Sequence, residues 1–195
     1  MKLAKSLDRL GTETAFSVLA EAKKLEAKGK PMIHLGLGQP DFKTPKHIVD
    51  AAKKALDDGH HGYVLSNGIL ECRQAVTRKI KKLYNQDIDP ERIIIMPGGK
   101  PTMSYAIQCF GEPGVEIVHP TPAFPIYESM INFTGAKPVP YDLTEDKDLK
   151  FNPEKILSLI TEKTKLLILI NPNNPTGSFV DKSDIDVLAE GLKKH

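Results

Sequence analysis

Three short segments carry residue types suited to binding a flat, negatively charged ligand. In the run Pro97–Thr102, Gly99 and Lys100 precede an expected helix, whose N-terminus favours an anion, and glycine allows close backbone approach. Phe124 lies in a proline-framed run where an aromatic side chain could stack on a flat ring. The run Asn171–Gly177, NPNNPTG, supplies amides that hold an oxyanion without changing charge.

Two further candidates lie earlier in the chain. Gly38, in the run GLGQPDF, allows a ligand to approach the backbone closely. This run is not a dinucleotide fingerprint, because Asp41 stands at the third glycine position. Tyr63 follows His60 and His61, which lack the neighbouring Cys, Asp or Glu ligands of a metal site, so we predict none there.

Each of these segments also has an ordinary structural explanation. Taken alone, the run Pro97–Thr102 is better explained by a glycine turn before a helix, and it departs from a P-loop because Pro101 follows the lysine. Phe124 alone is typical of a core aromatic, and proline-rich turns such as 171–177 also occur for structural reasons. The density of amides and prolines in 171–177 makes it the most specific of the three signals.

The elements that must position these residues alternate between strands and helices from residue 92 onward. The apolar patterns predict strands at 92–96, 115–119, 137–143 and 165–170, and helices at 103–110, up to about 133, 153–160 and from near 181. Earlier helices are expected at 14–28, 45–56 and 69–84, after an irregular basic arm at 1–11. Alternation of this kind predicts an α/β fold with a mostly parallel sheet between two helical layers.

Composition and charge narrow the class of protein. The 195 residues are 40% hydrophobic and 27% charged, and the net charge of +2 is spread along the chain, so no nucleic-acid surface is expected. We find no apolar segment long enough for a signal peptide or a membrane span, and therefore expect a cytoplasmic protein. Cys72 and Cys109 are expected to be buried free thiols, and the basic residues of 69–84 a solvated helix face.

Taken together and in order, these segments resemble the class I/II aminotransferases, pyridoxal-phosphate enzymes of fold type I, and most closely the aspartate aminotransferase group. The matching runs are GLGQPDF at 36–42, HGYVLSNG at 61–68, PGGKPT at 97–102, HPTPAFPIY at 119–127 and NPNNPTG at 171–177. The resemblance implies an N-terminal arm, helix and first small-domain segment at residues 1–44. Residues 45–195 would be the first part of the cofactor-binding large domain, with an incomplete sheet.

The resemblance also implies residue roles. The backbone N–H groups of Gly99 and Lys100 would bind the phosphate of pyridoxal 5'-phosphate, Phe124 would stack on its ring, and Asn174 would hold its phenolic oxygen. Gly38, with Phe124 and Asn174, would contact the substrate. Tyr63 would reach the phosphate of the neighbouring subunit, which implies a homodimer with a shared site. Many relatives have tryptophan where Phe124 stands, and the family leads us to expect cis peptide bonds before Pro122 and Pro175.

No catalytic residue is assigned within the chain. The resemblance implies that the lysine forming a Schiff base with the cofactor, an aspartate and an arginine follow His195, and Lys100 is not a substitute because it lies in the phosphate-binding run. We therefore expect the N-terminal portion of an aminotransferase that acts on an amino acid, aspartate or a similar one, and a 2-oxo acid. The alternatives are a non-catalytic cofactor-binding or assembly fragment, and a related pyridoxal-phosphate lyase or synthase.

Overall fold

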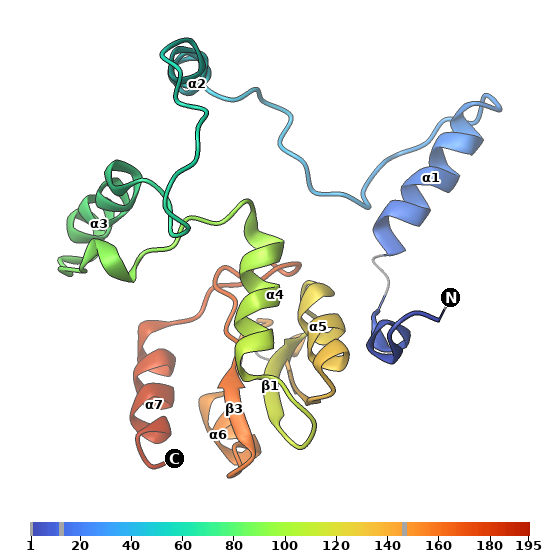
Figure 1. Ribbon diagram of the computed structural model, residues 1–195. Coiled ribbons are helices and arrows are strands. Elements are labelled where there is room, and N and C mark those ends of the chain that lie inside the picture. Colours follow the sequence, from blue (N-terminus) through green and yellow to red (C-terminus); the bar gives the residue numbers. More distant parts are fainter. Residues whose placement is uncertain (1, 12–13, 146–147) are drawn as a thin grey trace. The chain divides into compact units, whose positions relative to one another are not determined.

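The computed structural model describes residues 2–11, 14–145 and 148–195, and the chain divides into two compact units (Figure 1). The first unit combines Met1–Thr14 with Gly99–His195, and the second unit is Ala15–Gly98. Each is described by itself below. The predicted boundary between a small-domain segment and a large domain, at residues 44 and 45, stays a prediction.

The first unit is built on a parallel sheet with the order β2-β1-β3 in the described part of the chain. Strand β1 (Glu116–Thr121) pairs on one side with β2 (Lys137–Asp142) and on the other with β3 (Thr164–Leu167). Both pairings are parallel, so β1 is the central strand of the three. The predicted parallel pairing is confirmed.

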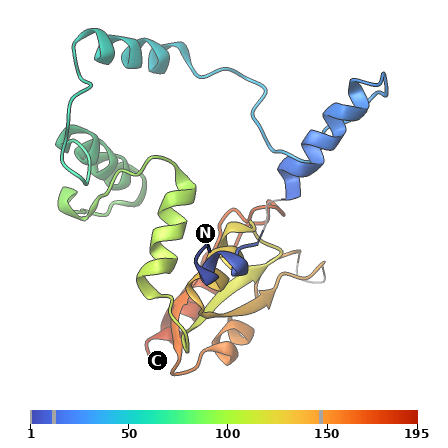
Figure 2. The same ribbon diagram turned by 45° about the vertical axis from the view of Figure 1, so that its right-hand side comes forward.

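Helices cover both faces of this sheet, which makes the first unit a three-layer α/β/α structure (Figures 1 and 2). Helices α4 (Gly99–Phe110) and α5 (Ile126–Thr134) pack around Ile117 on one face, while α6 (Pro153–Leu159) and α7 (Lys182–Leu192) pack around Val118 on the other. Successive residues of a strand point to opposite faces of the sheet. Because helices cover both faces, Ile117 and Val118 are both fully buried. The predicted fold class is confirmed.

One predicted strand is wrong and the limits of two other elements differ. Residues 93–96 form no strand in the described structure, although three consecutive isoleucines are typical of one; Ile94 is 64% exposed, and no neighbouring strand pairs with the run. Strand β3 ends at Leu167 rather than at residue 170, although Ile168 N still donates to the Val118 carbonyl at 2.9 Å. Helix α4 begins at Gly99, so the expected glycine loop is largely its first turn.

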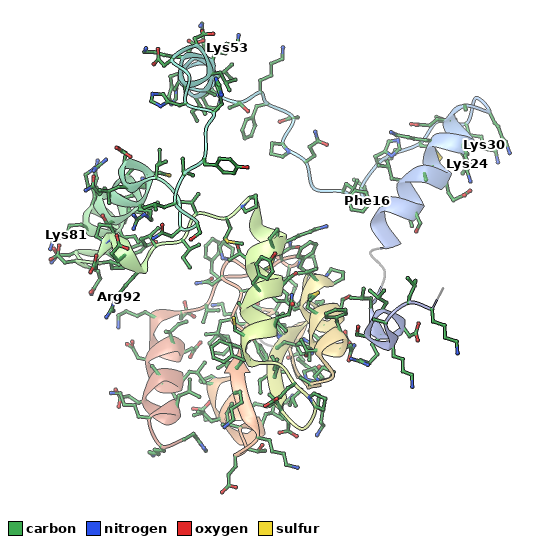
Figure 3. The ribbon with its side chains drawn as sticks, viewed as in Figure 1. Phe16, Lys24, Lys30, Lys53, Lys81 and Arg92 are labelled. Atoms are coloured by element: carbon green, nitrogen blue, oxygen red, sulfur yellow. The ribbon has the colours of Figure 1, made fainter. Side chains whose placement is uncertain are left out.

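The second unit contains the helices α1 (Thr14–Glu26), α2 (Lys46–Asp57) and α3 (Leu70–Tyr84), followed by the 3-10 helix η2 (Pro90–Arg92). Gly29 and Gly59, which follow α1 and α2, have φ angles of 77° and 84°, which suit glycine. Lysines at 24, 53 and 81 extend outward from these helices, as expected of solvated faces (Figure 3).

Arg73 on α3 is an exception to the predicted solvated face, and its side chain is only 2% exposed. Its guanidinium donates to the Gly68 and Pro90 carbonyls, each at 3.1 Å, and pairs with Glu91 at 2.7 Å. It is buried because it joins the turn before α3 to η2. Arg73 lies three residues before Val76 and therefore on the same face of α3. This spacing is the sequence signal that could have indicated the burial of Arg73.

The N-terminal arm and the cysteines also differ from expectation. Residues Lys5–Arg9 form a 3-10 helix, η1, rather than an irregular lead-in, and Arg9 donates to the Asn132 carbonyl at the end of α5 at 2.7 Å. Neither cysteine forms a disulfide, as predicted, but Cys109 is exposed and Cys72 half-buried. Cys109 follows the buried Ile107 by two positions, which places it on the opposite face of α4.

Candidate functional site

The loops that follow β1 and β3 are brought together at the carboxyl ends of these strands. Residues 121–125 follow β1 and residues 171–177 follow β3. Asn173 Nδ2 joins the two loops by donating to the Pro122 carbonyl at 3.4 Å. This is the edge of a parallel sheet where α/β proteins place their ligands.

Both loops contain cis peptide bonds. The bonds Thr121–Pro122 and Asn174–Pro175 are cis, as predicted. A third, Asn171–Pro172, is cis as well and was not expected from the sequence.

The start of α4 contributes the third segment of the site. Lys100 Nζ lies 5.5 Å from the centroid of the half-buried Phe124 ring, in the range of a cation–π contact. The helix N-terminus carries the positive end of the helix dipole. A Cβ added at Gly99 would meet only Met103 Cε at 3.8 Å, so a ligand can approach this backbone closely. The arrangement suits a ligand that joins a flat ring to an anionic group.

The two adjacent asparagines of the loop 171–177 have different surroundings. Asn174 is exposed, and its side chain has no hydrogen-bond partner among the described residues, so its amide is available to a ligand. Asn173 is 6% exposed and holds the loop closed: its N–H donates to the Ser178 carbonyl at 2.9 Å, and its carbonyl accepts from Gly177 N at 2.8 Å. Sequence reasoning selected Asn174 and missed the bridging role of Asn173.

His119 is a second residue that sequence reasoning missed, and it lies within β1, two residues before the cis bond. It is 4% exposed, and its Nδ1 lies 3.1 Å from the Pro120 carbonyl. Because a carbonyl only accepts, Nδ1 donates, and Nε2 is a buried acceptor without a partner in the described structure. Burial lowers the pKa of His119, against the opposing effects of the Pro120 carbonyl and Glu128. A histidine within an apolar strand was the available signal.

A pocket of about 280 Å³ lies beside these groups. His119, Phe124 and Glu128 line it, together with the prolines of the loop 121–125.

Gly38 and Tyr63 belong to the second unit. Gly38 is exposed with no atom within 4 Å of an added Cβ, so its backbone is open to a ligand. The Tyr63 side chain is fully exposed and lines a hollow of about 610 Å³ with residues that include Ala55, Val64 and Ile69. Within the first unit, the structure brings together Gly99, Lys100, Phe124 and, through Asn173, the loop of Asn174.

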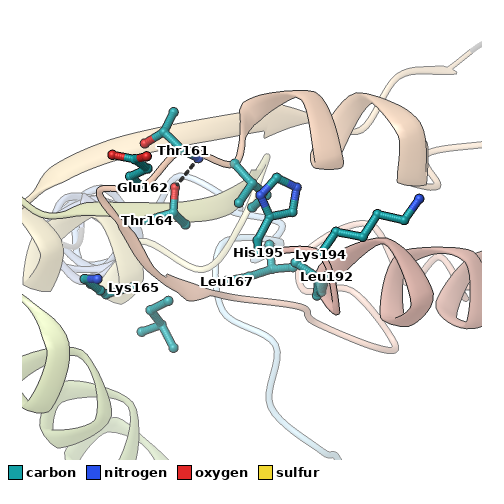
Figure 4. A pocket seen from close by; sticks show the side chains of 10 residues that line it. Thr161, Glu162, Thr164, Lys165, Leu167, Leu192, Lys194 and His195 are labelled. Atoms are coloured by element: carbon teal, nitrogen blue, oxygen red, sulfur yellow. Dashed lines mark hydrogen bonds between the residues drawn. The ribbon is translucent and has the colours of Figure 1, made fainter.

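Another hollow, of about 580 Å³, lies along β3 and the end of α7 (Figure 4). Its lining includes Lys165, Leu192 and His195, and the Thr161 N–H donates to Thr164 Oγ1 at 3.0 Å beside it. None of the predicted site residues lines this hollow, so volume alone does not identify the site.

Two kinds of feature are absent among the described residues. No group of three or more His, Cys, Asp or Glu side chains in the described part of the chain is placed to hold a metal ion. No helix within residues 2–11, 14–145 and 148–195 is both long and apolar enough to cross a membrane.

A parallel α/β unit with a glycine-bearing helix N-terminus, an aromatic ring and an amide loop at its strand ends has the features of a cofactor-binding α/β protein. The sequence model of the family "Aminotransferase class I and II" matches residues 30–195, and the chain belongs to this family. The expected resemblance is confirmed.

Individual relatives agree with this assignment. The aspartate aminotransferase of Bacillus subtilis is 35% identical over all 195 residues, which cover 50% of that protein. Solved structures of the Thermus thermophilus aspartate aminotransferase with maleate and of a Pyrococcus furiosus alanine aminotransferase match with TM-scores of 0.94 and 0.93, at 30% and 31% identity. The two matches cover 100% and 99% of this chain, and 51% and 50% of the solved chains, respectively. The chain thus spans about half the length of the relatives it matches.

Proposed function

We propose that the whole protein is a pyridoxal-phosphate-dependent aminotransferase that transfers an amino group between an amino acid, aspartate or a similar one, and a 2-oxo acid. The observation that carries this proposal is the convergence of the α4 N-terminus, Phe124 and the 171–177 loop in one unit of a class I and II aminotransferase. The relatives named for aspartate support the substrate class.

The residues present fit the cofactor's three recognisable parts. A phosphate needs N–H donors and positive potential, which the start of α4 at Gly99 and Lys100 offers. A pyridine ring needs a flat apolar face, which Phe124 offers. A phenolic oxygen needs a neutral donor, which Asn174 offers, because its amide has no hydrogen-bond partner among the described residues. When bound, pyridoxal phosphate supplies the electron sink for the chemistry.

This chain's residues would bind and orient, and the rest of the protein would supply the reacting groups. The α4 N-terminus would anchor the anionic end of the cofactor, and Phe124 would fix the plane of its ring. Asn174 Nδ2 would donate to the phenolic oxygen and so favour its charged form. The open backbone at Gly38 contacts the substrate carboxylate. We assign Tyr63, with its exposed hydroxyl, to the phosphate of a neighbouring subunit in a homodimer with shared sites.

The covalent lysine, the aspartate facing the ring nitrogen and the arginine for the substrate carboxylate are proposed to lie in the other half of the protein. Lys100 is not assigned as the covalent lysine, because it lies in the first turn of α4 with its ammonium beside Phe124. On this view residues 1–44 belong to the arm and small domain, and residues 45–195 begin the large domain of a cytoplasmic enzyme.

The test is transamination by the full-length protein. With pyridoxal phosphate, aspartate and 2-oxoglutarate, we expect glutamate to accumulate. Failure to transaminate aspartate, alanine or any other common amino acid would refute the proposal. Comparing kcat/KM for aspartate and alanine decides the substrate class, since solved relatives carry both names.

The position of the covalent lysine is tested separately by borohydride reduction and peptide mass spectrometry. We expect the cofactor on a lysine outside the 195 residues. A stoichiometric adduct on Lys100 would overturn the assignment of residue roles.

A further inference from the structure

We infer that Asn173 is a positioning residue that sets the spacing between the loop carrying Phe124 and the loop carrying Asn174. Asn173 lies within the site that we propose for the cofactor, and the inference rests on that proposed function. Its side chain is 6% exposed, and its Nδ2 contacts the Pro122 carbonyl at 3.4 Å and Thr176 Oγ1 at 2.9 Å. One amide therefore joins the segment after β1 to the segment after β3.

The direction of the hydrogen bonds around this amide follows from the bond that Ser178 makes at the other end of the network. Ser178 Oγ donates to the Leu149 carbonyl at 2.7 Å, and a carbonyl oxygen can only accept. The single hydroxyl proton of Ser178 is thereby used. Thr176 Oγ1, which is 2.8 Å from Ser178 Oγ, must be the donor in that pair. Thr176 Oγ1 is consequently an acceptor toward Asn173.

This chain of donors leaves only one orientation for the Asn173 amide. Both neighbours on that side, Thr176 Oγ1 and the Pro122 carbonyl, require an N–H donor, and the two N–H bonds of Nδ2 supply one to each. A flipped amide would place Oδ1 against two acceptors. The observed orientation leaves Oδ1 buried without a partner in the described structure. An orientation held despite that loss indicates that the two donors matter to the loop geometry.

The position of Asn173 matters for Phe124 and Asn174, because these two side chains are proposed to contact the same ligand. The backbone of Asn173 is already held at both ends by Ser178 and Gly177, so its side chain is a rigid strut rather than a mobile one. Pro122 lies two residues before Phe124, and Asn174 is the next residue of the other loop. Losing the strut should alter how the ring face and the phenolic-oxygen donor are spaced, while both side chains remain present.

The test uses the full-length protein with Asn173→Asp, which keeps the shape but removes both N–H donors. We expect the dissociation constant for pyridoxal phosphate to rise at least tenfold. We also expect the pH midpoint of the bound cofactor's absorbance change to shift by at least half a pH unit. The reason is that the hydrogen bond from Asn174 to the phenolic oxygen would be poorly aligned. In the cofactor-free protein, amide hydrogen exchange should increase in both 121–125 and 171–177. Asn152→Asp is the matched control, because Asn152 caps α6 from an exposed position, a role that aspartate also fills.

A second pair of variants keeps the inference testable if Asn173→Asp does not fold. Thr176→Val removes the acceptor for Nδ2 without changing the shape, whereas Thr176→Ser keeps the hydroxyl. We expect the valine variant to bind cofactor about threefold more weakly and the serine variant to match the wild type. A folded Asn173→Asp protein with wild-type affinity, absorbance midpoint and exchange overturns the inference, as does equal behaviour of the two Thr176 variants. A wild-type protein that neither binds pyridoxal phosphate nor transaminates refutes the proposed function itself.

Discussion

Phe124 is the residue whose proposed role depends most directly on side-chain shape. Its ring is half-buried, with Lys100 at 5.5 Å on one side. Stacking contributes about 0.5–1.5 kcal/mol beyond area burial. We therefore expect Phe124→Leu to weaken cofactor binding about three- to tenfold, measured by fluorescence titration. Phe110→Leu is the control, because Phe110 is 51% exposed at the end of α4. Equal affinities for the wild type and Phe124→Leu would exclude stacking.

We expect His119 to make the stability of the protein depend on pH. Burial lowers its pKa below the ordinary value of 6.5, so the unfolded chain binds more protons than the folded chain below that pH. The free energy of unfolding should be unaffected by this group above pH 6.5 and should fall as the pH drops below it. His119→Val removes both the titrating ring and Nε2, which has no partner in the described part of the chain.

The free energies of unfolding of the wild type and His119→Val are compared by urea unfolding of the cofactor-free full-length proteins at pH 5 and pH 7.5. We expect His119→Val to reduce the loss of stability at pH 5 and to raise the free energy of unfolding there by on the order of 1 kcal/mol. His61→Gln, in an exposed loop, should leave the wild-type pH dependence unchanged. An unchanged slope in His119→Val would contradict the role assigned to burial.

Arg73 is held by three acceptors, which its forked guanidinium can reach and a lysine ammonium cannot match. Its Nε and one terminal nitrogen reach the Gly68 and Pro90 carbonyls and Glu91 from a site that is 2% exposed. Arg73→Lys should leave the half-buried Gly68 or Pro90 carbonyl without its donor and lower the free energy of unfolding by about 1–3 kcal/mol. Denaturant melts of the full-length protein test this. The exposed Arg78, on the same helix, provides Arg78→Lys as the control, and equal melts for both variants would count against the buried network.

At the scale of elements, Glu116 ties the three strands together at their starting ends. It is the first residue of β1, pairs with Lys137 of β2 at 2.9 Å, and accepts from Thr161, just before β3, at 2.7 Å. Lys137 and, second, the Thr161 hydroxyl lower the pKa of Glu116 below the ordinary value of 4.5. The folded chain therefore releases this proton more readily than the unfolded chain.

The sign of the effect follows from this lowered pKa. The stabilisation is fully present above about pH 4.5 and is lost as the pH falls through the folded-state pKa. Glu116→Gln should flatten the acid limb of a plot of melting temperature against pH, with little change near neutral pH beyond the lost ion pair. Glu112→Gln, an exposed neighbour, should keep the wild-type limb. If Glu116→Gln keeps the wild-type acid limb, the contacts of Glu116 do not contribute to the pH dependence of the melting temperature.

At the scale of the whole molecule, the two units differ in how much they bury. The first unit has apolar clusters on both faces of its sheet, whereas the buried residues described in the second unit are Ala22 and Arg73. Apolar side chains of the second unit such as Ile33 and Leu35 are 87% and 91% exposed. A segment with so little buried apolar surface cannot offset its conformational entropy alone.

We therefore expect residues 15–98, expressed alone, to show no cooperative thermal transition. Circular dichroism and calorimetry should give a gradual loss of helix without a heat-capacity peak. The full-length protein, measured in parallel, should melt cooperatively. A sharp, reversible transition in the isolated segment would show that the second unit has a core of its own.

The sequence by itself determined the features that depend on residues a few positions apart. The glycines after α1, α2 and α5 stop those helices because they supply a left-handed residue, and the pattern at 115–119 predicts the strand β1. The runs 97–102, 121–125 and 171–177 were identified as candidate segments, and two contacts, Lys100 with Phe124 and Asn173 with Pro122, join these runs in one unit. The roles of their residues stay predictions.

The tertiary structure decided what depends on partners far along the chain. Residues 93–96 have the composition of a strand but no neighbouring strand in the described structure, because pairing is not a local property. The burial of Arg73 and His119 depends on which backbone and side chains pack against them. Asn173 and Asn174 are the same residue type side by side in one motif, and only the position of the Pro122 carbonyl, 51 residues away, makes the first a strut and leaves the second available to a ligand.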